Sequence, residues 1–156
     1  TRVNKLAKLK AMSGAERRWL LQAWLLLPVV SLFLRGIGLR QTQGLLVTFV
    51  GRLAVTEIER QQARALADTI ARLVSSASRY SLVGANCLPQ ALVLWLLLRR
   101  SGISSELRIG VRKESDKFEA HAWVELFGLA LNNQTGVERR YTPFEASILP
   151  PEVRLP

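Results

Sequence analysis

The stretch Ser81–Arg100, SLVGANCLPQALVLWLLLRR, decides the fold. Beyond Cys87 it is apolar at almost every position, which is typical of a helix that is buried on all sides. Pro89 suits the first turn of such a helix, where its missing amide is not needed, and Gly102 is a stop signal behind the paired arginines. We therefore expect a central buried helix that runs from near Cys87 to about Arg100.

The hydrophobic period changes to two after this helix, which indicates strands. Ser105–Arg112 and Ala120–Leu126 are expected to be strands, and the charged segment Lys113–Phe118 between them a loop. Phe127-Gly128 is expected to form a tight turn before a third strand, Leu129–Asn132. Helices followed by a small antiparallel sheet predict an α+β domain.

Further helices are expected before the central one. Ser13 to Glu16 and Thr56 to Glu59 both have the capping-box pattern, in which Ser or Thr and a Glu three residues later satisfy each other's backbone amides. The expected helices are Arg17–Leu27, which Pro28 kinks or ends, Gln41–Leu53, and Glu57–Ser76. The arginines of the third of these, Arg60, Arg64 and Arg72, are expected to form a solvated face, with a docking site for an acidic peptide as the alternative.

The segment Trp19–Leu34 is uncharged and mostly apolar, and it lies between Arg18 and Arg35. A helix that spans a membrane needs roughly 20 apolar residues. This segment is shorter, and Pro28 interrupts it. We therefore favour a buried pair of helices, with a segment lying at a membrane interface as the alternative.

The composition predicts one domain with a basic surface. The chain has 156 residues, is 49% hydrophobic, and carries 22 Lys+Arg against 12 Asp+Glu, a net charge of +10. Such a charge favours acidic partners, but no basic run alternates with aromatics, so no nucleic acid is expected. One Cys and one His cannot form an internal disulfide or a structural zinc site. We expect a reducing, cytoplasmic location, no metal and no cofactor.

The single cysteine and the single histidine are the candidate catalytic residues. Cys87 at a helix N-terminus would face unpaired amides and the positive end of the helix dipole, which favour a thiolate and can stabilise an oxyanion. His121 is expected on a strand face with Trp123 and Glu125, where it would act as the general base. The alternative is a structural role, since a lone Cys is usually a small buried hydrophobe.

A third side chain would orient the imidazole. A three-residue turn at Leu126–Gly128 places Asn133 opposite His121, whereas a two-residue turn brings Asn132 or Gln134 to that face. An Asn can accept the ring N–H, as in Cys-His-Asn proteases.

Three segments carry a family resemblance: ANCLPQALVLWLLLRRSGISSELRIGVRK (residues 85–113), FEAHAWVELFG (118–128) and YTPFE (141–145). Together they closely resemble the transglutaminase-like cysteine proteases of lasso peptide biosynthesis. These bacterial leader peptidases are related to the C-terminal domain of the microcin J25 maturation protein. The resemblance implies a transglutaminase/papain-like core over residues 56–156, preceded by a helical part over residues 1–55, within a single domain of residues 1–156.

The resemblance implies that Cys87 is the nucleophile and His121 the base. The third member in that family is an Asp after the hairpin, whereas here the region reads LALNNQTG without an Asp. Asn133 or Asn132 would have to substitute, or Glu138 or another carboxylate would be supplied from elsewhere.

The implied reaction is cleavage of a ribosomally made precursor peptide between leader and core, through an acyl-thioester. The chain is expected to be too short for a leader-binding domain, so the implied partners are a separate leader-recognition protein and an ATP-dependent macrolactam cyclase. The domain would be cytoplasmic, with the surface of the inner membrane as an alternative location. The competing functions are a transglutaminase-type acyltransferase and a non-catalytic module that binds a peptide or a membrane.

Overall fold

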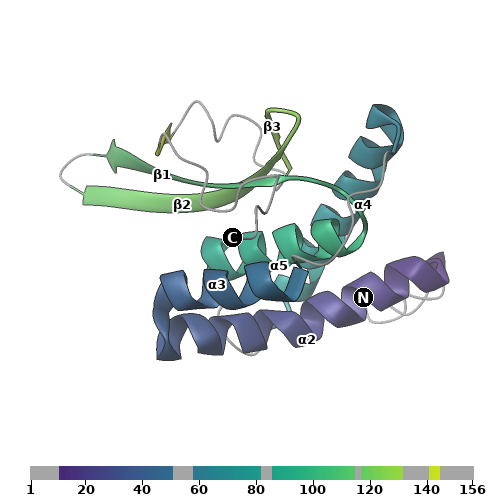
Figure 1. Cartoon of the computed structure of the whole chain (residues 1–156), viewed down its shortest axis with the longest axis horizontal. Helices are drawn as coiled ribbons and strands as arrows, with labels where there is room; N and C mark the ends of the chain where they lie inside the picture. Colours follow the sequence, from purple (N-terminus) through teal and green to yellow (C-terminus); the bar gives the residue numbers. More distant parts are fainter. Residues whose placement is uncertain (1–10, 51–57, 82–85, 115–116, 132–140, 145–156) are drawn as a thin grey trace, which may run out of the picture.

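The protein is an α+β domain, as predicted. A computed structural model describes residues 11–50, 58–81, 86–114, 117–131 and 141–144. In this part, four helices pack on one side of a four-stranded antiparallel sheet, with α5 under β1 and β2 (Figure 1). The elements are α2 (Gly14–Gly36), α3 (Gly38–Val50), α4 (Arg60–Ser78), α5 (Cys87–Arg100), β1 (Glu106–Glu114), β2 (Lys117–Leu126), β3 (Leu129–Ala130) and β4 (Thr142–Pro143).

Helix α5 is the buried centre of the domain, and the prediction of its bounds is confirmed. Every residue from Ala91 to Leu98 is at most 2% exposed. The helix packs against α2, α4 and the sheet, so each of its sides is covered by an apolar neighbour. It ends at Arg100, and Gly102 follows with a positive φ of 78°, which glycine adopts without strain.

Helix α2 differs from the prediction in its length. The capping box is confirmed, because the Ser13 amide donates to the Glu16 carboxylate (2.8 Å) and the Glu16 amide to the Ser13 hydroxyl (3.2 Å). The helix does not end at Pro28, however, but continues to Gly36. Buried residues lie on both sides of the proline, so packing holds the helix together across the missing hydrogen bond: Ala23, Leu27, Val30 and Ser31.

The expectation of a buried helix pair over Trp19–Leu34 is therefore wrong. This segment belongs to one helix, and only 22% of its most apolar 18-residue window is buried. By length and composition alone, α2 could cross a membrane. The helix has apolar side chains on two sides, and the rest of the domain covers one of them.

Helices α3 and α4 begin at other residues than predicted. Helix α3 starts at Gly38, three residues early, and Gly38 has a φ of 82° that separates it from α2. Helix α4 starts at Arg60, since Ile58 and Glu59 are not helical, and the predicted first residue Glu57 lies outside the described residues. The amide of Ala63 donates to the carbonyl of Glu59, so Glu59 is the N-cap, and its side chain makes no capping bond. Thr56 lies outside the described residues.

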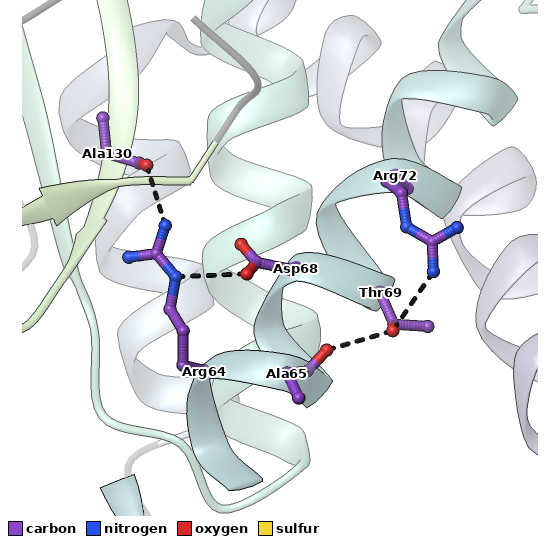
Figure 2. A network of polar contacts seen from close by, with 6 residues as sticks. All are labelled: Arg64, Ala65, Asp68, Thr69, Arg72 and Ala130. Carbon is purple, nitrogen blue, oxygen red and sulfur yellow. Dashed lines mark hydrogen bonds and ion pairs between the residues drawn. The ribbon is translucent and has the colours of Figure 1, made fainter. Parts of the chain in front are cut away.

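The arginine face of α4 is bound to its surroundings, as Figure 2 shows. Arg64 forms an ion pair with Asp68 (3.2 Å) and donates to the carbonyl oxygen of Ala130 on β3 (3.5 Å). Arg72 donates to the Thr69 hydroxyl (3.3 Å). Arg64 thus links the helix layer to an edge of the sheet and is not simply solvated.

The sheet has the order β3-β2-β1-β4. The predicted loop Lys113–Phe118 is wrong, because β1 and β2 stay paired as far as Glu114 and Lys117. Lys113, Lys117 and Phe118 are exposed at this end, where both faces of a hairpin can be solvated. The turn at Phe127-Gly128 is confirmed with two residues, which have φ values of 54° and 76°. Positive φ at both turn residues is the requirement of a type I′ turn, whose twist matches that of the flanking strands.

Candidate active site

The two faces of β2 have different surroundings, as the alternation predicted. Ala122, Val124 and Leu126 belong to the main core with α5. On the other face, Trp123 is fully buried and forms a second cluster with Tyr141, which precedes β4. The Trp123 indole N–H donates to the Glu125 carboxylate (2.8 Å), so the polar edge of this buried ring has a partner.

Gly110 on β1 makes room for this second cluster. It pairs with His121 on β2 and with Pro143 on β4. A Cβ at this position would lie 2.8 Å from the carbonyl oxygen of Thr142 and 2.8 Å from Cη2 of Trp123. Any larger residue would therefore displace either the indole ring or β4.

Cys87 is the first residue of α5. Asn86 is the N-cap in an extended conformation, and its side chain makes no capping bond. The first amides of a helix have no partner within it, and Pro89 supplies none, so the amides of Cys87 and Leu88 are the ones at the helix start that can meet a substrate oxyanion. The thiol is partly exposed and packs against the edge of the main core. It is thus accessible at the positive end of a 14-residue helix.

His121 lies half-buried against two aromatic rings. Its ring centroid is 5.1 Å from that of Tyr141 and 6.3 Å from that of Trp123. Its Nε2 atom is buried and has no hydrogen-bond partner in the part of the chain that the structure describes. Burial lowers the pKa of His121; the carboxylate of Glu119 opposes this shift and the charge of Arg112 adds to it. The imidazole is therefore neutral near pH 7 and can accept a proton.

Tyr141 covers the His121 ring. It is 8% exposed and stacks on His121 at 30°. Burial raises the pKa of its hydroxyl, as does its hydrogen bond with Glu119, and the charge of Arg112 opposes this shift. Helix α5, which begins with Cys87, packs against β2, which carries His121. Among the described residues, no hydrogen bond joins Cys87 to His121, and such contacts are often long before substrate binds.

Residues 33–146 match the family profile described as the transglutaminase-like superfamily. The chain belongs to the transglutaminase-like superfamily. This superfamily includes cysteine proteases and acyltransferases. No curated protein and no solved structure matches the chain.

The hairpin has the two-residue turn, which is one of the two alternatives considered for the third member of the triad. The turn before β3 has two residues, so the three-residue turn that favoured Asn133 is not formed. Asn132 and Asn133 lie outside the described residues, as does Glu138. Within them, Glu119 is a carboxylate whose charge acts on His121.

Glu119 is held by two neighbours on the His121 face. It accepts two bonds from Arg112, at 2.6 and 2.8 Å, and its pKa is lowered first by Arg112 and then by Tyr141. The sequence analysis did not identify Glu119 or Tyr141. The signal for Glu119 was its position two residues before His121, which puts it on the same strand face.

The described residues contain no group of three or more His, Cys, Asp or Glu side chains that could hold a metal ion. The side chains that the site does offer are a thiol and an imidazole, together with backbone amides. A partly exposed thiol at a helix start and a neutral imidazole on a strand can together attack a carbonyl and transfer its acyl group.

Proposed function

We propose that this transglutaminase-like domain is a cysteine peptidase that removes the leader from a ribosomally made lasso peptide precursor. The observation that carries the proposal is the placement of Cys87 at the start of α5 and of His121 on β2, the strand that packs against α5. The resemblance of the segments around Cys87 and His121 to the lasso leader peptidases supports this choice within the superfamily.

The reaction would proceed in two balanced steps. His121 takes the thiol proton as the Cys87 sulfur attacks the carbonyl of the last leader residue, and the new oxyanion lies at the start of α5. The core peptide leaves as an amine with the proton from His121, and the leader stays on Cys87 as a thioester. Water then attacks the thioester with His121 as the base, which releases the leader acid and restores the thiol.

The proposal includes two partner proteins. A separate leader-recognition protein would deliver the precursor, and an ATP-dependent cyclase would use the freed amine of the core to close a macrolactam. Both partners and the precursor would be cytoplasmic. The cleavage must come before the cyclisation, because the cyclase needs the amine that the peptidase releases.

The experiment is an intact-mass measurement of a candidate precursor after incubation with this protein and its leader-binding partner. The expected result is one cut at the leader–core junction, absent with Cys87→Ala and with His121→Ala. Phe118→Gln is a matched control, since this exposed side chain lies on β2 three residues from His121. Cleavage that persists with Cys87→Ala would refute the proposal.

Acyl transfer is the second candidate, because the superfamily also contains acyltransferases. The same thioester would then be taken by an amine and not by water. Product masses separate the two reactions, since hydrolysis adds one water across the cut bond whereas transfer adds the amine. An unchanged precursor with both proteins folded, and again with the cyclase present, would favour the non-catalytic alternative.

A further inference from the structure

The outward side of α2 carries a continuous apolar stripe. Its members follow one another at intervals of one, three or four residues, the spacing of one helix face. Each is between 43% and 62% exposed: Leu21, Trp24, Leu25, Val29, Leu32 and Phe33. Isolated exposed apolar residues are ordinary in proteins, but a contiguous stripe of this size marks an interaction surface.

The opposite side of α2 is held by the domain. Ala23, Leu27 and Val30 are at most 2% exposed, and the helix packs against α4 and α5. A helix that crosses a bilayer would have to leave this core. The apolar stripe can instead enter the interface while the inner side stays on the protein, which is how amphipathic surface helices lie.

Arginines mark both ends of the stripe. Arg18 lies three residues before Leu21 and Arg35 three residues after Leu32, so both are on the same side of the helix as the stripe, about 26 Å apart along its axis. Both side chains are exposed, and so is Arg40 in the first turn of α3. Residues 17–56 contain five arginines and no Asp or Glu. Every charged side chain in this part of the sequence is therefore positive.

We propose that the stripe of α2 docks this domain on an anionic lipid membrane. Leu25, Leu32 and Phe33 enter the boundary between headgroups and acyl chains, with Trp24 at the headgroup level. The flanking arginines meet lipid phosphates. A lipid surface suits a helix face that has no charged side chain between Arg18 and Arg35. The acyl region of a membrane carries no fixed polar groups that would need partners on this face. The proposal is independent of the activity at Cys87.

The experiment is flotation of the full chain with vesicles of phosphatidylcholine alone or mixed with phosphatidylglycerol. The protein is expected to float with the mixed vesicles. The triple variant Leu25→Gln/Leu32→Gln/Phe33→Gln should lose this binding, since burial of each half-exposed side chain contributes about three-fold or more. These side chains are exposed, so circular dichroism should show an unchanged fold. Phe118→Gln, which removes a 76% exposed ring on β2, should bind as the wild type does.

A second variant tests the electrostatic part. Arg18→Gln/Arg35→Gln/Arg40→Gln should weaken binding to the anionic vesicles by about 100-fold, because each arginine at an anionic surface contributes about five-fold. The proposal is overturned if the folded protein does not float, or if both triple variants float as the wild type does. It is also overturned if the apolar substitutions instead dissociate a dimer or release a protein partner without vesicles, since the stripe would then be a protein interface.

Discussion

Replacing Gly110 by alanine is expected to destabilise the domain and disturb the surroundings of His121. The new Cβ would lie 2.8 Å from both the Thr142 carbonyl oxygen and the Trp123 ring, too close for either to stay in place. Overpacking of this kind costs about 1–3 kcal/mol. Alanine also restricts the unfolded chain, which offsets about 0.5–1 kcal/mol. The net loss in the free energy of unfolding should therefore be about 1 kcal/mol and at most about 2.5 kcal/mol.

Urea denaturation measures this loss, and a double-mutant cycle tests its cause. Trp123→Phe makes room for the Cβ, so its cost should be smaller by about 1 kcal/mol or more in the Gly110→Ala background than in the wild type. Gly44→Ala is the matched control. No atom lies within 4 Å of a Cβ there, and alanine in α3 should stabilise the domain by about 0.5–1 kcal/mol. If Gly110→Ala is as stable as the wild type and shows no coupling to Trp123, the packing described at β4 is refuted.

Three further predictions concern the His121 face and the β2–β3 turn. Burial lowers the pKa of His121 below its ordinary 6.5, so the unfolded chain binds this proton at a higher pH than the folded chain does. The free energy of unfolding should therefore fall as the pH drops through 6.5. Urea denaturation of His121→Gln should show a shallower fall with pH, and a fall equal to that of the wild type would contradict the burial of His121. Tyr141→Ala uncovers the imidazole and should raise the NMR-measured pKa of His121 toward 6.5, whereas Tyr141→Phe keeps the stacked ring and should leave this pKa low. Equal pKa values in the two variants would mean that Tyr141 does not shield His121 from water. Phe127→Asn should stabilise the domain by about 0.5 kcal/mol in urea denaturation, because Asn tolerates the φ of 54° and the relief of this backbone strain exceeds the lost contact with Arg60. A loss of stability would mean that the Arg60 contact stabilises the domain by more than the turn conformation costs.

Local patterns were sufficient to predict the centre of the fold, the position of Cys87 at a helix start and the strand face of His121. Helix α5 is apolar all round, so its burial and its ends follow from its own residues. The alternation in β2 likewise gives the face on which His121 lies, because side chains of a strand alternate strictly.

The features that depend on distant contacts were not predicted. The outward stripe of α2 is as apolar as its inward side, and only the neighbouring helices decide which side stays exposed. Tyr141 reaches His121 because β4 pairs with β1, a contact between segments that are about thirty residues apart in sequence. The prediction of a loop at Lys113–Phe118 was also wrong because of contacts between separate segments. Backbone pairing of β1 with β2 extends both strands beyond the residues that pack in the core.

The most direct test of the proposed reaction is the mass of the protein itself during turnover. The wild type, quenched in acid while it processes a precursor with its leader-binding partner, is expected to carry an adduct on Cys87 with the mass of the leader less one water. This adduct is a thioester, so hydroxylamine should remove it, and Cys87→Ala should never acquire it. Processing without any Cys87 adduct, at equal rates in the wild type and Cys87→Ala, would contradict the account.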